Sequence, residues 1–357
     1  MKLSKVIIAY LFGRKKKCNN FDLNNISSIL IRPFGFALGD SLIHLAFAEQ
    51  LRSIYPNLKL GIMAGRNRDL FITSNLFDKI IPCNFLEYTK NHKKWQLLLD
   101  FRETYNTPDL IADKILSPET TIIFSKQDKE YYNRETISNY DFCYPFDPNS
   151  HVVNHLQTSI FGQYFDLPRI IPKLTIPHVE IDKVSPIWDR LFTLPANLGK
   201  TLNILLAPQG NAQLKKQVPP SELAQLLNES LPVSSRIRVL MGYTIGSKEY
   251  FQTLKELCRY DILLGLSPPT TLKEYLALSA SADIIIGVDS GTVHLACALQ
   301  KPLLSFYARH NIDTWHPLSN PNTPHLMITA SQNNNNPVAT ENFPIELAVK
   351  WLSQQIS

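Results

Sequence analysis

Short runs of consecutive apolar residues alternate with longer mixed stretches from residue 28 onward, and this alternation constrains the fold more than any other feature of the sequence. A run that is apolar at every position is typical of a strand buried on both faces of a parallel sheet. Strands that alternate with helices indicate βαβ units. In the first part of the chain we predict strands at 28–32, 59–64, 79–82, 95–101 and 121–125, and helices at 41–55 and 108–116.

A proline-rich stretch at 167–185 interrupts the alternation and indicates a connection between two domains. A second series follows it, with predicted strands at 202–207, 237–241, 262–264, 283–288 and 303–307, and helices at 219–231, 247–260, 272–279 and 292–299. The sequence therefore predicts an α/β protein of two Rossmann-like domains, with a ligand cleft between them.

We divide the chain into four parts on this basis. Residues 1–25 form a basic N-terminal extension, 26–178 the N-terminal Rossmann-like domain, and 179–340 the C-terminal one. Residues 341–357 hold a helix, at 344–353, that is a candidate to pack back on the N-terminal domain. The length is sufficient for two full hydrophobic cores.

The charge is concentrated at the N-terminus. The 357 residues carry 36 Lys and Arg against 31 Asp and Glu, and six of the basic residues but none of the acidic ones lie in residues 1–20. That segment is therefore +6 and the remainder −1. Because nucleic-acid-binding domains spread basic groups over a folded face, we expect no nucleic-acid partner. Five scattered cysteines without metal-ligand spacing indicate free thiols in a reducing, cytoplasmic compartment.

The N-terminal extension contains an apolar stripe at helical spacing. Its members fall at i, i+3, i+4, i+7 and i+8, and they are Leu3, Val6, Ile7, Tyr10 and Leu11. The segment is too short to span a bilayer, and its basic cluster at 14–17 follows the apolar run, unlike that of a signal peptide. Two interpretations stay open: the stripe lies in a membrane interface next to anionic lipids, or it packs on the protein's own body.

The segment 284–299 joins an apolar strand to a helix through a tight loop. Ser290, Gly291 and Thr292 stand at the start of this helix, where free backbone N–H groups attract a phosphate. Asp289 and His294 are candidates for polar contacts to that phosphate or to a ribose. The alternatives are that Asp289 caps the helix and that His294 is a packed core residue.

A second strand–loop–helix segment, at 29–41, contains Asp40. A carboxylate at the carboxyl edge of the sheet is a candidate general base, and the alternative is an N-cap aspartate. A third segment, at 207–219, contains Lys216, which is a candidate to neutralise a diphosphate leaving group or else a solvated lysine. Four further basic residues are candidates to bind an anionic acceptor or else parts of solvated loops: Arg66, Arg68, Lys93 and Lys94.

Several common motifs are absent from the sequence. There is no Gly-x-Gly, no phosphate-binding Gly-x-x-x-x-Gly-Lys loop and no Gly-x-Ser-x-Gly nucleophile elbow. Neither an Asp-x-Asp pair nor a histidine pair with zinc spacing occurs. We therefore expect no metal and no cofactor.

Three of these segments, taken in order, resemble glycosyltransferase family 9, the ADP-heptose:lipopolysaccharide heptosyltransferases. Asp-Ser-Gly-x-x-His-Leu-Ala-x-Ala-Leu at 289–299 matches the family's C-terminal motif in full. Leu-Gly-Asp at 38–40 is similar to its N-terminal Gly-Asp motif, and Lys-Gln-Val-Pro at 216–219 to its Lys-x-Trp-Pro segment, with Val218 in place of the tryptophan.

The resemblance implies a GT-B fold and an inverting, metal-independent glycosyltransferase. It implies that a nucleotide-sugar such as ADP-heptose binds the C-terminal domain, and that a lipid-linked core oligosaccharide at the cytoplasmic face of the inner membrane binds the N-terminal one. Asp40 would then be the base, and Lys216 with the N–H groups at 290–292 would hold the diphosphate. Glu249 is the candidate for a ribose contact. The alternatives in other classes are a nucleotide-sugar epimerase of GT-B shape and a non-catalytic sugar-nucleotide-binding protein.

Overall fold

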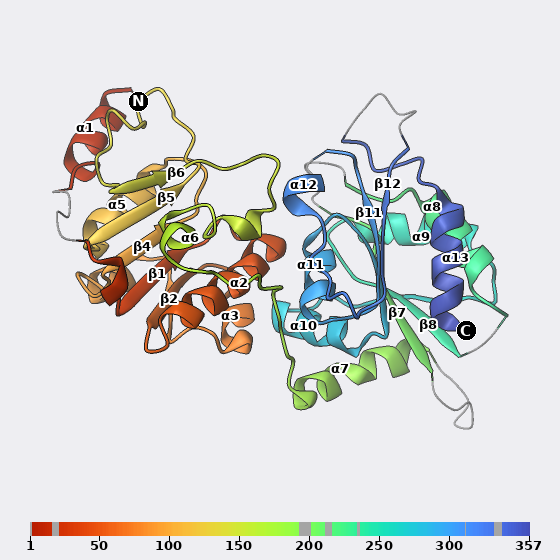
Figure 1. Ribbon diagram of the computed structural model, residues 1–357. Coiled ribbons are helices and arrows are strands. Elements are labelled where there is room, and N and C mark those ends of the chain that lie inside the picture. Colours follow the sequence, from red (N-terminus) through yellow and green to blue (C-terminus); the bar gives the residue numbers. More distant parts are fainter. Residues whose placement is uncertain are drawn as a thin grey trace. The chain divides into compact units, whose positions relative to one another are not determined.

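The computed structural model describes residues 2–15, 21–192, 201–210, 216–233, 236–310, 312–331 and 338–357. Residues 16–20 of the basic extension, including Cys18, lie outside the described residues. The chain divides into two compact units, Met1–Ile170 and Ile171–Ser357 (Figure 1). This division precedes the predicted boundary at 178, because the segment after 170 packs with the second unit: the N–H of Leu174 donates to the carbonyl of Ala298 at 2.9 Å.

The N-terminal unit is built on a six-stranded parallel sheet of order β3-β2-β1-β4-β5-β6. Its strands are β1 Ser28–Arg32, β2 Lys59–Ala64, β3 Lys79–Pro82, β4 Leu97–Asp100, β5 Thr120–Phe124 and β6 Phe142–Tyr144. Its α-helices are α1 Lys2–Phe12, α2 Leu38–Ile54, α3 Arg68–Ser74, α4 Phe85–Lys90, α5 Thr107–Leu116 and α6 Ile160–Tyr164. The short strand β6 and the helices α3, α4 and α6 were not predicted from the sequence.

The strand order reverses between β1 and β4, which are neighbours in the sheet. Right-handed crossovers on the two sides of this point place α2 and α3, which contact each other, on one face and α4 and α5 on the other. The loops that follow β1 and β4 therefore meet at the carboxyl edge of the sheet. In open α/β sheets, such a topological switch point is the usual place for ligands.

Helix α1 packs on α5, with Ala9 buried and Ile8 and Phe12 against a cluster that includes Tyr105 and Leu110. The predicted stripe lies on the other side of the helix. Its five members, from Leu3 to Leu11, are each between 48% and 73% exposed. The helix thus packs on the rest of the N-terminal unit, as one of the two interpretations predicted, but it does so through a different face. The apolar stripe that suggested a membrane interface is exposed to solvent.

The C-terminal unit repeats this architecture, with a parallel sheet of order β12-β11-β10-β7-β8-β9. The strands are β7 Leu202–Ala207, β8 Ile237–Met241, β9 Leu263–Leu266, β10 Ile284–Val288, β11 Leu303–Tyr307 and β12 His325–Thr329. The α-helices are α7 His178–Leu191, α8 Pro220–Ser230, α9 Ser247–Leu257, α10 Leu272–Ser281, α11 Gly291–Ala298, α12 Ile312–Trp315 and α13 Ile345–Ile356. Here the switch point lies between β7 and β10, and the last strand, β12, was not predicted.

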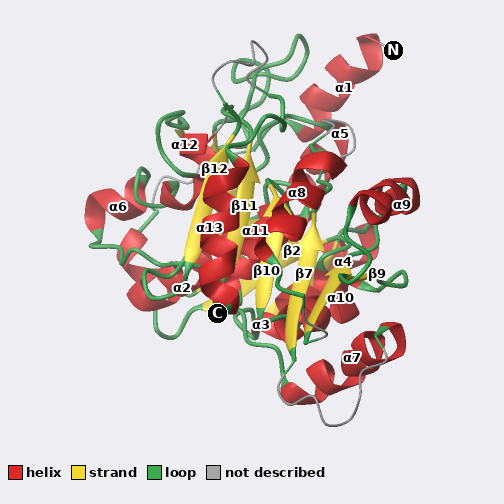
Figure 2. Cartoon of the chain, turned by 90° about the vertical axis from the view of Figure 1, so that its right-hand side faces the viewer, coloured by secondary structure: helices red, strands yellow, loops and turns green. Residues whose placement is uncertain are grey.

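Two helices differ from the sequence expectation. Helix α7 begins inside the stretch that we predicted as an irregular connection, and Pro186 lies within it. Helix α13, the predicted C-terminal helix, packs against α8 and β12 of the C-terminal unit (Figure 2). Its residues Ile345, Ala348 and Leu352 are buried in the core of that unit. The reason is that α13 is amphipathic and follows the last strand, so its apolar side buries itself against the nearest uncovered face of the sheet in its own unit.

Candidate functional site

Asp40 lies in the first turn of α2, at the switch point of the N-terminal unit. The helix begins at Leu38 with Ala37 as its N-cap, so Asp40 is not the N-cap that the alternative interpretation required. The carboxylate lies directly against the loop that follows β1, because a Cβ atom at Gly35 would collide with its Oδ2. Any side chain at position 35 would therefore displace this carboxylate.

Asn67, which the sequence analysis missed, holds this loop on the start of α2. Its buried Nδ2 donates to the carbonyl of Phe36 at 2.7 Å and to the hydroxyl of Ser41 at 2.7 Å. The ring of Phe36 lies between Gly65, where a Cβ would approach it to 2.8 Å, and the guanidinium of Arg102 at 4.8 Å. These residues can be found from the strand order: β2, β1 and β4 are neighbours in the sheet, so the loops that follow these three strands lie side by side.

The environment of Asp40 suits a general base. Burial, and secondly the negative charge of Glu103, raise the pKa of the Asp40 carboxyl to about 6, while the Arg66 guanidinium opposes this rise. A base works best when its pKa lies near the operating pH, and it must be ionised there. Asp40 meets both conditions at neutral pH, and Glu103 is a second residue that the sequence analysis did not select.

The four basic acceptor candidates separate into two pairs. Arg66 and Arg68 follow β2, so they lie at the carboxyl edge with Asp40, and both are exposed. Lys93 and Lys94 precede β4 and therefore lie at the opposite, amino edge of the same sheet. In a parallel sheet, loops that enter strands and loops that leave them are separated by the full strand length. Only Arg66 and Arg68 accompany Asp40.

In the C-terminal unit, Lys216 and Asp289 meet at the switch point. The Nζ of Lys216 lies 2.5 Å from Oδ2 of Asp289, with 25% and 12% of the two side chains exposed. Gly210 supports this approach, since its N–H donates to the carbonyl of Lys216 at 2.7 Å and a Cβ there would contact the carbonyl of Asp289 at 3.1 Å. Asp289 is thus paired with a lysine and is not the N-cap of the following helix.

The N-cap of α11 is Ser290, whose hydroxyl makes no capping hydrogen bond. Its Oγ is buried and has no hydrogen-bond partner among the described residues. Gly291 and Thr292 form the first turn, and the Thr292 hydroxyl bonds to that of Tyr275 at 2.7 Å. The start of α11 thus offers backbone N–H groups close to the Lys216 and Asp289 pair, an arrangement that is able to bind a phosphate.

His294 matches the alternative interpretation of a packed core residue. It is 7% exposed, and its ring lies edge-on to Trp315 at 5.8 Å between centroids. Burial lowers its pKa to about 4, so the imidazole is neutral at physiological pH. Glu249 is exposed in the first turn of α9, which follows β8 at the same edge of the sheet as Lys216.

Other features of the described residues complete this picture. No group of three or more His, Cys, Asp or Glu side chains in the described ranges has the arrangement of a metal site. No described helix is long and apolar enough to cross a membrane. Cys83, Cys143, Cys258 and Cys297 are free thiols.

A comparison with protein families assigns most of the chain. A family model described as glycosyltransferase family 9 (heptosyltransferase) matches residues 130–342. The lipopolysaccharide heptosyltransferase 1 of Campylobacter coli is 25% identical over 156 residues, which are 43% of this chain. The match spans 44% of that relative's length.

Solved structures show the same fold over nearly the whole chain. An ADP-heptose lipopolysaccharide heptosyltransferase II of E. coli has a TM-score of 0.70 at 16% identity, covering 93% of this chain and 100% of its own. A family 9 glycosyltransferase of Veillonella parvula has a TM-score of 0.73 at 14% identity, with 95% and 99% covered. The E. coli heptosyltransferase WaaC with ADP has a TM-score of 0.65 at 13% identity, with 92% and 99% covered. The predicted GT-B fold is confirmed.

Proposed function

Because the chain belongs to glycosyltransferase family 9, the heptosyltransferases, we propose that it transfers a heptose or a closely related sugar from ADP-heptose to a lipopolysaccharide core acceptor. That it is a glycosyltransferase follows from the family. The proposed donor and acceptor follow the names of the similar heptosyltransferases. The proposed roles of individual residues rest on Asp40 in one unit and on Lys216 and the start of α11 in the other.

In this proposal Asp40 is the general base. The acceptor hydroxyl donates its proton to the Asp40 carboxylate while its oxygen attacks the anomeric carbon of the donor sugar. The new glycosidic bond forms as the bond to the nucleoside diphosphate breaks, so the anomeric configuration inverts. A pKa of about 6 keeps Asp40 ionised at pH 7 and still basic enough to take the proton. Arg66 and Arg68, at the same edge, supply positive charge for an anionic acceptor.

The leaving group gains negative charge as the sugar departs. Lys216 and the first N–H groups of α11 supply the compensating positive charge. Ser290 Oγ, which is buried without a partner among the described residues, is proposed to turn toward the ligand and donate a hydrogen bond to a phosphate oxygen. Glu249 is proposed to accept a hydrogen bond from the ribose. Since Lys216 and the helix start stabilise the diphosphate, we propose that the reaction proceeds without a metal or a cofactor.

The observation that carries the proposal is the Asp40 carboxyl, largely shielded from solvent at the switch point. The test is Asp40→Asn, which keeps the shape of the side chain and removes the base. We expect transfer to a truncated core acceptor to fall at least about 100-fold, while ADP binding, measured by calorimetry, is unchanged. Asp69→Asn is the matched control, since Asp69 also lies in the first turn of a helix at this edge. Normal turnover of Asp40→Asn would overturn the assignment.

The same assay separates the alternative functions. An epimerase would convert the donor with no acceptor present, and a binding protein would bind the donor without transferring its sugar. We expect that the donor is not converted when the acceptor is absent, and that its sugar is transferred when the acceptor is present. NMR of the product then identifies the linkage.

We further propose that the chain docks on the cytoplasmic face of the inner membrane through α1, where its lipid-linked acceptor is held. The support is the exposed apolar stripe of α1, next to a basic segment. Leu3→Asp with Ile7→Asp should abolish sedimentation with anionic vesicles. Ile72→Asp, at an exposed apolar residue of α3, is the control and should have no effect. Unchanged sedimentation of the Leu3 and Ile7 variant would refute the docking.

A further inference from the structure

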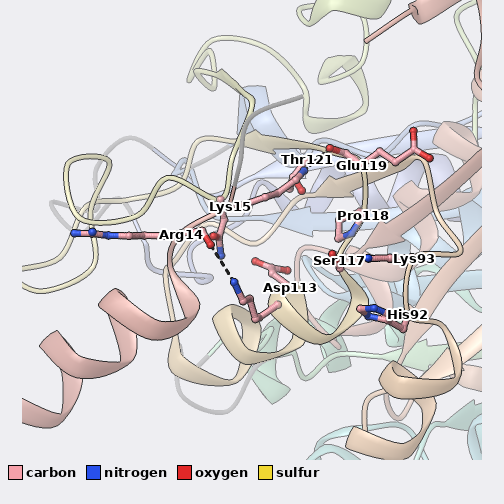
Figure 3. A pocket seen from close by; sticks show the side chains of 11 residues that line it. Arg14, Lys15, His92, Lys93, Asp113, Ser117, Pro118, Glu119 and Thr121 are labelled. Carbon is pink, nitrogen blue, oxygen red and sulfur yellow. Dashed lines mark hydrogen bonds between the residues drawn. The ribbon is translucent and has the colours of Figure 1, made fainter. Parts of the chain in front are cut away.

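A lysine is buried at the carboxyl edge of the N-terminal sheet. Lys126 follows β5, and neither its side chain nor that of its partner Asp100 is exposed. Lysine is almost never fully buried unless its charge is paired. By contrast, Lys93 and Lys114, which line a cavity of about 640 Å³ at the opposite edge of the sheet (Figure 3), are exposed. The proposed reaction uses none of these three lysines, and the buried one requires an explanation.

Lys126 holds the loop that follows β4 at two points. Its Nζ donates to Oδ2 of Asp100 at 2.7 Å and to the carbonyl of Arg102 at 2.9 Å. The other carboxylate oxygen of Asp100 accepts a hydrogen bond from the N–H of Arg102 at 3.0 Å. The residue after Lys126 adds a further bond, since the N–H of Gln127 donates to the carbonyl of Glu103 at 2.6 Å. The segment after β5 thus fixes the backbone of residues 100–103.

The other groups around Lys126 belong to one buried cluster. Arg32, at the end of β1, donates to Asp100 at 2.9 Å and to Asp113 at 2.6 Å. The Nε of Arg32 also lies 3.7 Å from a carboxylate oxygen of Asp109. Burial favours the neutral form of Asp100, but the charges of Lys126 and Arg32 outweigh this and hold the pKa of Asp100 below its ordinary value. Two tyrosine rings flank the ammonium group of Lys126: Tyr105 and Tyr140.

The loop that Lys126 holds is packed against the surroundings of Asp40. The guanidinium of Arg102 lies 4.8 Å from the ring centroid of Phe36, in the loop before α2. Gly35, the neighbour of Phe36, is the residue that lies directly against the Asp40 carboxylate. A displacement of Arg102 would therefore remove a contact that holds this loop closed on Asp40.

The same loop carries the negative charge that acts on Asp40. After burial, the charge of Glu103 is the next cause of the raised pKa of Asp40, and Arg66 opposes it. Glu103 is exposed, and its carboxylate forms no ion pair within the part of the chain that the structure describes. Its place near Asp40 is therefore set by its backbone, which Lys126 and Gln127 hold.

We propose that Lys126 is a positioning residue for the transfer reaction, because it holds the loop 101–103 so that Arg102 and Glu103 stay next to the site of Asp40. In this role Lys126 contacts neither the donor nor the acceptor and acts only through the loop. The inference rests on the role of Asp40 proposed above, which it deepens.

The test is the pH profile of kcat/KM for Lys126→Met, which keeps most of the length of the side chain and removes its charge. If Lys126 positions Glu103, the released loop carries that negative charge away from Asp40. The acidic limb should then move to lower pH by about half a unit. If Lys126 acted only through its own positive charge, its loss would raise the pKa of Asp40 and move the limb to higher pH. A shift to higher pH, or no shift, overturns the proposal.

The background variant Glu103→Gln makes the test specific. With Glu103 already neutral, Lys126→Met should add no further shift to lower pH, because the charge that it positions is gone. Equal shifts in both backgrounds would show that Lys126 does not act through Glu103. The matched control is Lys129→Met, since Lys129 lies in the same segment and its Nζ donates to the carbonyl of Tyr105 at 2.7 Å. Its acidic limb should stay in place, and a shift as large as that of Lys126→Met would also overturn the proposal.

A second variant covers the case in which Lys126→Met does not fold, which thermal unfolding reveals. Gln127→Pro keeps the buried charges and removes only the N–H that holds the carbonyl of Glu103. Its limb should move to lower pH as well, and an unchanged limb would overturn the proposal. The outcomes also separate this inference from the proposed function. Normal turnover of Asp40→Asn refutes the base itself, whereas lost turnover of Asp40→Asn with an unmoved limb in Lys126→Met refutes only the positioning.

Discussion

Lys216 Nζ lies 2.5 Å from Asp289 Oδ2, so two residues selected separately from the sequence as donor ligands are partners of one another. They are 73 positions apart, and they meet because β7 and β10 are neighbours in the sheet. The carboxylate holds the lysine beside the start of α11 before any ligand arrives. Such preorganised charge stabilises a departing anion without the cost of reorganisation during the reaction.

Replacing Lys216 by Met should lower the transfer rate about 100-fold or more, because the leaving diphosphate loses its cation. ADP affinity should fall more than AMP affinity, since AMP lacks the second phosphate. Calorimetry with both nucleotides measures the difference. Lys255→Met, at an exposed position on α9, serves as control, and equal losses for ADP and AMP would contradict the assignment to the diphosphate.

Ser290→Ala should weaken ADP binding about 3- to 10-fold, as expected for one lost hydrogen bond. Its effect on stability should be small, because the Ser290 hydroxyl makes no capping bond and has no partner in the described part of the chain. Thermal unfolding without ligand checks this point. A melting temperature that falls while ADP affinity is retained would identify a structural cap in place of a ligand contact.

The sequence was sufficient for the fold class because the strands of both sheets are nearly all apolar at consecutive positions. It was not sufficient for α7, since Pro186 lies inside that helix, or for the short edge strand β6. Asn67 and Glu103 were missed because their roles depend on which strands are adjacent, and local patterns do not reveal adjacency. Lys93 was grouped with the acceptor site by charge alone, although its place before a strand already indicated the opposite edge.

The pH dependence of transfer should report the charges around Asp40. Protonation of Asp40 should reduce kcat/KM below about pH 6. Because Glu103 raises the pKa of Asp40 and Arg66 lowers it, Glu103→Gln should move this acidic limb to lower pH and Arg66→Gln should move it to higher pH. Profiles of kcat/KM from about pH 5 to about pH 8 test both, and shifts in the same direction would remove Asp40 from the role of base.

Asp40→Asn should also stabilise the protein at high pH. The pKa of Asp40 is raised in the folded state, so folding favours the protonated carboxyl, and this destabilises the folded protein progressively as the pH rises from about 4 to about 6. At about pH 8 the full cost is present, and the variant should be more stable by about 1–2 kcal/mol after allowance for solvent screening. Below about pH 4 the two proteins should unfold alike. Urea denaturation at these two pH values, with Asp69→Asn as control, measures the difference. If Asp40→Asn stabilised the protein equally at the two pH values, ionisation of Asp40 would carry no burial cost in the folded protein. The pKa of Asp40 would then not be raised, and Asp40 would lose the property that suits it to act as a base.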